Sequence, residues 1–214
     1  MTGGTETILQ KYSQTHSFIR RIEPELREAI KLLIDCFVGG GKLLVCGNGG
    51  SCADASHIVG ELVKAFKLPR PLADEENAAL KAQGPDGESL CAKLQGGLSA
   101  IDLGAQTALI TAMINDVGGD YIFAQQVMSY GRPGDVLLGI STSGNSKDIL
   151  YAAAIARVKG MKLIGMTGKN GGKMKANFDV TLCADSSVTE DIQDMHSSIY
   201  HALCAGLECH FWGN

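Results

Sequence analysis

The strongest constraint on the fold is a local pattern that occurs twice in the chain. A short, continuous apolar run is followed by a Gly- or Ser-rich turn, and the turn leads into a helical pattern. The first copy joins KLLVC (42–46) to GNGGS, and the second joins DVLLGI (135–140) to STSGNS. A continuous apolar run is typical of a strand that is buried on both faces, as in a parallel sheet.

Three further runs extend this pattern into a complete α/β domain. Strands are predicted at LSAID (98–102), KLIGMTG (162–168) and DVTLCA (179–184). Apolar spacing predicts one or two helices over 5–37 and further helices over 53–65, 106–114, 149–158 and 189–211. The alternation predicts a parallel-sheet α/β/α sandwich of about five strands, preceded by a helical extension over residues 1–39.

The segment 72–96 interrupts this alternation, with several prolines, glycines and charges and a short helical pattern at 75–82. We expect it to be a surface insertion within a single domain spanning 1–214, because the strand pattern resumes unchanged after it.

Composition excludes several classes of protein. The formal net charge of −4 is unlike the basic footprint of a nucleic-acid binder, so no direct nucleic-acid partner is expected. No stretch approaches the roughly 18 apolar residues of a membrane span, so no membrane partner is expected. The 7 cysteines form no Cys-x-x-Cys pair and lie mostly in apolar runs, which favours reduced, small buried residues in a cytoplasmic protein.

The turn after the second apolar run offers hydroxyl groups at a predicted helix start. Such a turn can bind a phosphate through hydroxyl and backbone N–H donors, although a simple helix cap uses the same residue types. Neither Gly-rich turn matches the Walker pattern or G-x-G-x-x-G, so no nucleotide cofactor is expected. The hydroxyls belong to Ser141, Thr142, Ser143 and Ser146.

Two predicted helices carry polar side chains among apolar neighbours. His57 and Glu61 are four residues apart and therefore share one helix face. The last helix carries Gln193, His196 and His201. The simpler interpretation of each histidine is a partly buried residue without a functional role. Gln193 and His201 are separated by roughly 12 Å along a helix axis and rotated by roughly 80°. If both serve one site, two chains contribute to it.

Five segments combine these features: CGNGGSCADASHIVGEL, MINDVGGDYIFAQQV, GDVLLGISTSGNSKDI, GMTGKNGGKM and EDIQDMHSSIYHAL. With them the chain resembles the SIS (sugar isomerase) family, and within it the phosphoheptose isomerases. The resemblance covers nearly the whole chain outside the segment 72–96. It implies a ketose–aldose isomerase that converts sedoheptulose 7-phosphate to D-glycero-D-manno-heptose 7-phosphate through an enediol.

The resemblance also implies a role for each site residue. The catalytic base falls on Glu61 and the acid on His201. Some members bind zinc at positions that match His57, Glu61, Gln193 and His201, and the family is typically a homotetramer with active sites between subunits. Substrate and phosphate contacts fall on Asn48, Gly49, Gly50, Ser51, Asn115, Asp116, Ser141, Thr142, Ser143, Ser146 and Gln193.

Two alternatives to the isomerase remain. The resemblance supplies the first, since similar SIS proteins are adaptors that bind the bacterial replication initiator, and the second is a sensor domain that binds a sugar phosphate without converting it. The adaptors lack the glutamate and the final histidine, whereas Glu61 and His201 are both present here. The residues therefore favour the isomerase.

Overall fold

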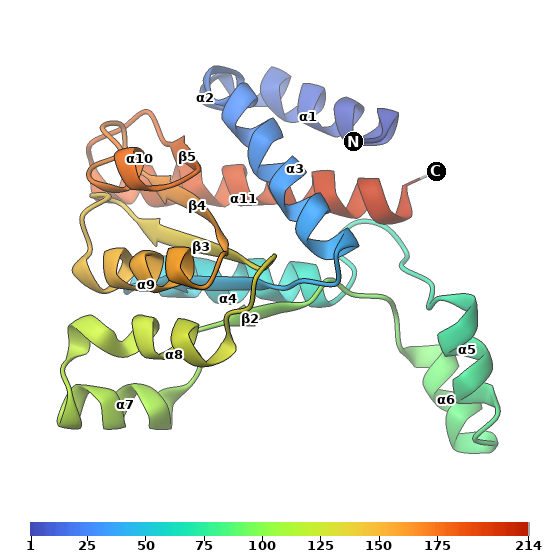
Figure 1. The fold of residues 1–214 in the computed structure, drawn as a ribbon. Coiled ribbons are helices and arrows are strands. Elements are labelled where there is room, and N and C mark those ends of the chain that lie inside the picture. The colour runs from blue at the N-terminus through green and yellow to red at the C-terminus, as the bar shows by residue number, and fades with distance from the viewer. Residues whose placement is uncertain (214) are drawn as a thin grey trace.

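A computed structural model describes residues 1–213 of the chain as a parallel five-stranded sheet with helices on both faces (Figure 1). This confirms the predicted α/β fold. The strands are β1 (Leu43–Gly47), β2 (Ala100–Asp102), β3 (Val136–Ser141), β4 (Lys162–Thr167) and β5 (Val180–Cys183). The helices are α1 (Gly3–Thr15), α2 (Ser17–Arg21), α3 (Glu23–Val38), α4 (Gly50–Val63), α5 (Asp74–Lys81), α6 (Pro85–Lys93), α7 (Thr107–Asp116), α8 (Ile122–Tyr130), α9 (Lys147–Val158), α10 (Met174–Asn177) and α11 (Thr189–Trp212), with a 3-10 turn η1 (Gly119–Tyr121).

The sheet has the strand order β2-β1-β3-β4-β5, and every neighbouring pair is parallel. β1 therefore lies inside the sheet, with β2 on one side of it and β3, β4 and β5 on the other. Ligands of parallel sheets commonly bind outside the carboxyl ends of the strands at such a switch point. The two Gly- and Ser-rich turns follow β1 and β3, so both lie at this edge.

Two apolar cores cover the two faces, because successive side chains of a strand point to opposite sides. In β1, Leu43 and Val45 join one core, whereas Leu44 and Cys46 join the other. The first core packs against α1, α3, α4 and α11, and the second packs against α8 and α9. Figure 1 shows α1 and α3 above the sheet and α7 and α8 below it. No helix among residues 1–213 is both long and apolar enough to cross a membrane.

The N-terminal region contains three helices, not the one or two that were predicted. α1 ends where His16 adopts an extended conformation, and α3 begins next to Pro24. Proline has no backbone N–H to donate and clashes with the preceding turn of a helix, so it is tolerated at a helix start but not inside. The predicted helix therefore divides before Pro24.

The segment 72–96 forms a helical hairpin of α5 and α6 that projects from the body of the molecule (Figure 1). α5 has no buried residue, and α6 buries only Gly87. The two ends of the hairpin meet at the body, because the N–H of Gly96 donates to the carbonyl of Arg70 over 2.8 Å.

All seven cysteines are free thiols. The expectation that they are buried holds for only three of them, since four are partly exposed. The buried thiols are Cys36, Cys46 and Cys204, and the partly exposed ones are Cys52, Cys91, Cys183 and Cys209.

Candidate active site

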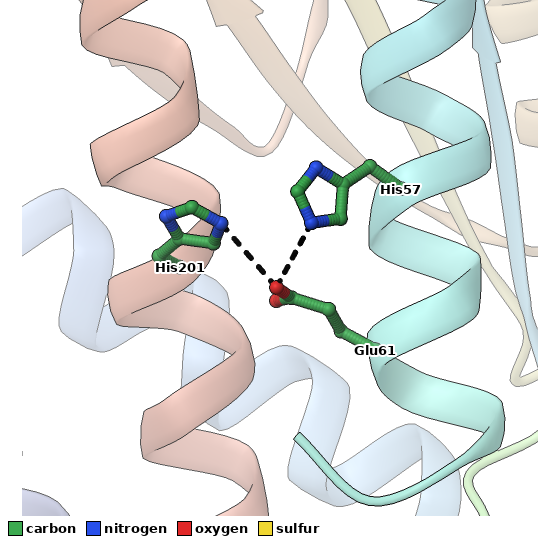
Figure 2. A group of neighbouring side chains, drawn as sticks. All are labelled: His57, Glu61 and His201. Atoms are coloured by element: carbon green, nitrogen blue, oxygen red, sulfur yellow. Dashed lines mark ion pairs between the residues drawn. The ribbon is translucent and has the colours of Figure 1, made fainter. Parts of the chain in front are cut away.

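Three polar side chains from two helices converge beside the first core (Figure 2). His57 and Glu61 lie on the same face of α4, and His201 reaches them from α11. The Oε1 atom of Glu61 is 3.1 Å from His57 Nε2 and 3.3 Å from His201 Nε2. We call these three residues the trio. Because α4 and α11 pack side by side in the core, the trio rests on rigid elements and not on a loop.

The surroundings change the protonation of the trio. Glu61 is only 7% exposed, and burial raises its pKa above that of an ordinary carboxyl, although the nearby His57 opposes the rise. Burial lowers the pKa of His201, and the neighbouring His57 and Lys67 lower it further. The pKa of Glu61 thus moves up toward that of a histidine, and the pKa of His201 moves down toward that of a carboxyl. Such shifts suit general acid–base chemistry.

The trio opens onto solvent through a cavity of about 440 Å³, which is lined by His57, Gly60, Glu61, Lys64, Ala65 and Phe66. The Phe66 ring stacks on His201 with ring centroids 5.6 Å apart. Phe66 thus connects His201 to the wall of this cavity.

A buried ion pair that the sequence did not reveal supports this arrangement. Arg70 and Glu208 are both almost fully buried, and Arg70 Nε donates to Glu208 Oε1 over 2.8 Å. The Arg70 guanidinium also donates to the backbone carbonyls of Glu61 and Leu62, at 2.7 and 2.6 Å. Glu208 in turn accepts three backbone N–H groups, from Phe66, Lys67 and Leu68. The pair thus ties the end of α4 to α11.

Tyr200 is a second contact that the sequence did not reveal. Its hydroxyl lies 2.9 Å from Nδ1 of His57, the ring nitrogen that faces away from Glu61. A tyrosine in an amphipathic helix usually indicates packing, so the residue gave no local signal of this role.

The turn after β1 packs against the start of α9. Asn48 Nδ2 donates to Asp148 Oδ2 over 2.9 Å, and Ser51 is buried. A Cβ on Gly50 would lie 2.5 Å from Nε2 of Gln193, so glycine at this position lets Gln193 approach the turn. The structure therefore places Gln193 beside the first turn.

The serine-rich turn after β3 forms a small polar hollow. Ser141 Oγ lies 2.8 Å from Ser146 Oγ and 3.4 Å from Ser143 Oγ. Gly144 has a φ of +64°, and a Cβ there would run into the backbone of Gly171, so glycine allows the two loops to pack. The adjacent cavity of about 170 Å³ is lined by Thr142, Ser143, Gly168, Lys169, Asn170, Gly171, Ser186, Ser187 and Ile192.

Several predicted site residues do not meet the trio within this chain. Glu61 is ten residues beyond Ser51, which corresponds to roughly 15 Å along α4. Asn115 and Asp116 are exposed at the end of α7, where Asn115 Nδ2 donates to Asp116 Oδ1 over 2.7 Å. The predicted residues thus fall into separate groups: the trio, the two turns with Gln193, and the end of α7.

His196 belongs to the core and not to the site. It is fully buried, and its Nε2 lies 3.2 Å from the carbonyl oxygen of Thr167. Burial lowers the pKa of His196 to about 4, so the imidazole is neutral at pH 7. His196 thus matches the simpler interpretation of a histidine on the last helix, a buried residue without a functional role.

The chemistry of the trio fits a divalent metal ion. Two imidazole nitrogens and a carboxylate oxygen lie within 4.8 Å of one another, and these are donor types that zinc prefers. The buried Glu61 Oε2 has no hydrogen-bond partner among residues 1–213, so it is an acceptor that a cation would satisfy. Gln193 lies apart from this group.

Comparison with known proteins connects this geometry to one family. Models described as SIS domain match residues 96–207 and 10–98. A phosphoheptose isomerase of Helicobacter pylori (strain P12) is 39% identical over 193 residues, covering 90% of this chain and 88% of that protein. Another, of Trichlorobacter lovleyi, is 37% identical and covers 97% of this chain and 96% of that protein.

Solved structures agree with the sequence comparison. The phosphoheptose isomerase of Neisseria gonorrhoeae has a TM-score of 0.73 at 32% identity, covering 94% of this chain and 92% of that one. A phosphoheptose isomerase from Francisella tularensis has a TM-score of 0.72 at 31% identity, covering 97% of this chain and 99% of that one. The similarity therefore extends over nearly the full length in both sequence and fold.

Proposed function

The chain belongs to the phosphoheptose isomerases of the SIS domain family, and from this we propose how its residues carry out the isomerisation of sedoheptulose 7-phosphate. The observation that carries the proposal is the convergence of Glu61, His57 and His201 at one carboxylate oxygen. The product is the aldose D-glycero-D-manno-heptose 7-phosphate.

Isomerisation moves one proton between neighbouring carbons and another between neighbouring oxygens. In our proposal Glu61 removes the proton from the carbon next to the carbonyl and returns it to the adjacent carbon of the enediol. The raised pKa of Glu61 makes this carboxylate a stronger base than an exposed glutamate. His201 transfers the proton between the two oxygens, and its ring stacks on Phe66, which lines the cavity.

The serine-rich turn is the proposed phosphate site. Ser141, Thr142, Ser143 and Ser146 offer hydroxyl donors without a nearby basic side chain in the turn. The start of α9 adds backbone N–H groups, which favour an anion. We assign Asn48, Gly49, Gly50, Ser51, Asn115, Asp116 and Gln193 to the sugar.

We propose that the trio holds one zinc ion. His57, Glu61 and His201 supply three ligands from this chain, and Gln193 is the fourth candidate. When bound, the ion would polarise the substrate carbonyl. The buried, unpartnered Oε2 of Glu61 supports this assignment.

A site completed by a neighbouring subunit, as in a homotetramer, follows from the spacing. Glu61 lies roughly 15 Å along α4 from the first turn, and His201 lies roughly 12 Å along α11 from Gln193. The open-chain sugar must contact the serine-rich turn with its phosphate and the trio with the carbons next to its carbonyl. Both contacts are easier to make if the trio and the turns come from different copies of the chain.

Mixing two variants with complementary defects tests this arrangement. At a substrate concentration well below KM, Glu61→Gln and the double variant Ser143→Ala, Ser146→Ala are each expected to be strongly impaired alone and to regain part of the activity when they are refolded together. Native mass spectrometry of the mixture establishes the subunit number. No recovery in confirmed mixed oligomers would place the whole site within one chain.

Glu61→Gln also tests the catalytic assignment. The amide keeps the shape but cannot accept the proton, so turnover of sedoheptulose 7-phosphate should fall by roughly 10² to 10⁴. The folded protein should be at least as stable as the parent, since burial disfavours the charged carboxylate. Glu75→Gln, an exposed residue of α5, is the matched control. Turnover within threefold of the parent would exclude Glu61 as the base.

The sequence also left open an adaptor for the replication initiator and a sugar-phosphate sensor. The relatives described here carry the isomerase name, and this chain has both the glutamate and the final histidine. The isomerase is therefore the function that we propose.

A further inference from the structure

Tyr200 connects to the trio through the ring nitrogen of His57 that does not contact Glu61. The residue is only 3% exposed, and its hydroxyl contacts Nδ1 of His57 at 2.9 Å. Figure 2 shows that one ring nitrogen of His57 faces Glu61 and the other faces away. The hydroxyl of Tyr200 is on that other side, so the two contacts together fix the plane of the imidazole.

We propose that Tyr200 is a positioning residue that directs Nε2 of His57 into the trio in both the metal-free and the metal-loaded protein. This proposal rests on the metal site and function assigned above. It assigns to a single hydroxyl the orientation of the His57 ring, and in the metal-free protein the hydrogen bond that this hydroxyl donates to Nδ1 favours the tautomer with hydrogen on Nε2.

In a neutral imidazole one nitrogen donates a hydrogen bond and the other accepts one. Without metal, Nε2–H of His57 donates to Glu61, so Nδ1 must accept a proton from its partner. When Nε2 ligates a cation, Nδ1 carries the hydrogen and must donate it. A tyrosine hydroxyl satisfies both states, because it is a donor and an acceptor. A carboxylate or a carbonyl could satisfy only the second state.

The hydroxyl of Tyr200 has a second polar neighbour besides His57. The carboxylate of Asp54 lies beside it. The buried Oδ2 of Asp54 has no hydrogen-bond partner among residues 1–213. That oxygen is available to accept the phenol proton when Nδ1 of His57 becomes the donor.

The first experiment measures zinc affinity by competition with a chromophoric chelator. Tyr200→Phe removes only the hydroxyl, and loss of such a supporting contact typically weakens metal binding by about 10- to 100-fold. We expect at least a tenfold loss, with a thermal midpoint close to that of the parent. Tyr151→Phe, in a ring pair with Tyr121 on the other face of the sheet, is the control and should bind zinc as the parent does. Unchanged affinity of Tyr200→Phe would overturn the proposal.

The second experiment does not depend on metal. Nitrogen NMR of the metal-free protein, labelled at histidine, reports which nitrogen of His57 carries hydrogen. The parent should show the proton on Nε2, and Tyr200→Phe should lose this bias, whereas Tyr151→Phe should not. Identical His57 spectra in the parent and Tyr200→Phe would overturn the proposal. If the parent binds no zinc, the metal assignment fails, and the NMR comparison still decides the role of Tyr200.

Discussion

Arg70 donates to the backbone carbonyl of Glu61 over 2.7 Å while its Nε binds the carboxylate of Glu208. The backbone of Glu61 is thereby joined to α11, the helix that carries His201. A buried charge that loses its partner is strongly destabilising, typically by about 3 to 5 kcal/mol. We therefore expect Arg70→Met to lower the free energy of unfolding in urea by this amount.

The cost arises from the unpaired Glu208 and should shrink when both charges are removed. The double variant Arg70→Met, Glu208→Gln removes both charges but keeps an oxygen acceptor for the backbone N–H groups, so it is expected to be more stable than Arg70→Met alone. Lys147→Ala breaks an exposed ion pair with Asp120 and serves as the control, with an expected change of less than about 1 kcal/mol. Equal losses for Lys147→Ala and Arg70→Met would refute the structural importance of the buried pair.

Removing two hydroxyls from the serine-rich turn should weaken substrate binding. Hydrogen bonds to a charged group contribute roughly 1.5 to 3 kcal/mol each, so Ser143→Ala with Ser146→Ala should raise KM at least tenfold. Inhibition by inorganic phosphate should weaken in parallel, because it probes the same contacts without the sugar. Ser129→Ala, at an exposed position on α8, controls for loss of a hydroxyl. A KM within twofold of the parent would be incompatible with the assignment.

His196 should make the protein sensitive to acid. Its pKa is about 4 in the folded chain, against 6.5 for the ordinary group, so only the unfolded chain takes up its proton between these values. The free energy of unfolding should therefore fall as the pH decreases from about 6.5 to 4, by on the order of 3 kcal/mol. His196→Gln keeps an N–H donor for Thr167 but does not titrate. Parallel urea-unfolding profiles for the two proteins across this range would contradict the prediction.

The α5–α6 hairpin should be removable. Its helices bury almost nothing, and the Gly96–Arg70 hydrogen bond holds its ends together. Replacing residues 73–94 by four glycines keeps Gln95, whose Oε1 accepts the N–H of Ala65 over 3.1 Å. The shortened protein should fold with a thermal midpoint within a few degrees of the parent, as measured by circular dichroism. A chain that fails to fold would show that the hairpin stabilises the body.

The sheet was predictable because its strands are buried on both faces and stand out as short apolar runs. The run 135–140, for example, corresponds to β3 at Val136–Ser141. The helices α6, α8 and the four-residue α10 were not predicted, and for two of them the physical reason is clear. α6 begins at Pro85, which looks like a break but is well placed at a helix start. α8 buries residues on more than one of its faces, so its buried residues do not show the spacing of three or four positions that indicates a helix.

The site was predictable only where the chain carries a local pattern. His57 and Glu61 share a helix face, and that spacing is visible in the sequence. The partners Arg70 and Tyr200 gave no such signal, because their contacts depend on residues more than a hundred positions away or on backbone atoms. Such contacts follow from the packing of α4 against α11.

The position of His201 on α11 has a consequence for biosynthesis. Glu61 precedes four of the five strands in the chain, and His201 follows all of them. A growing polypeptide therefore carries Glu61 long before it carries His201. The trio can form only after all five strands have been synthesised and α11 has docked against α4.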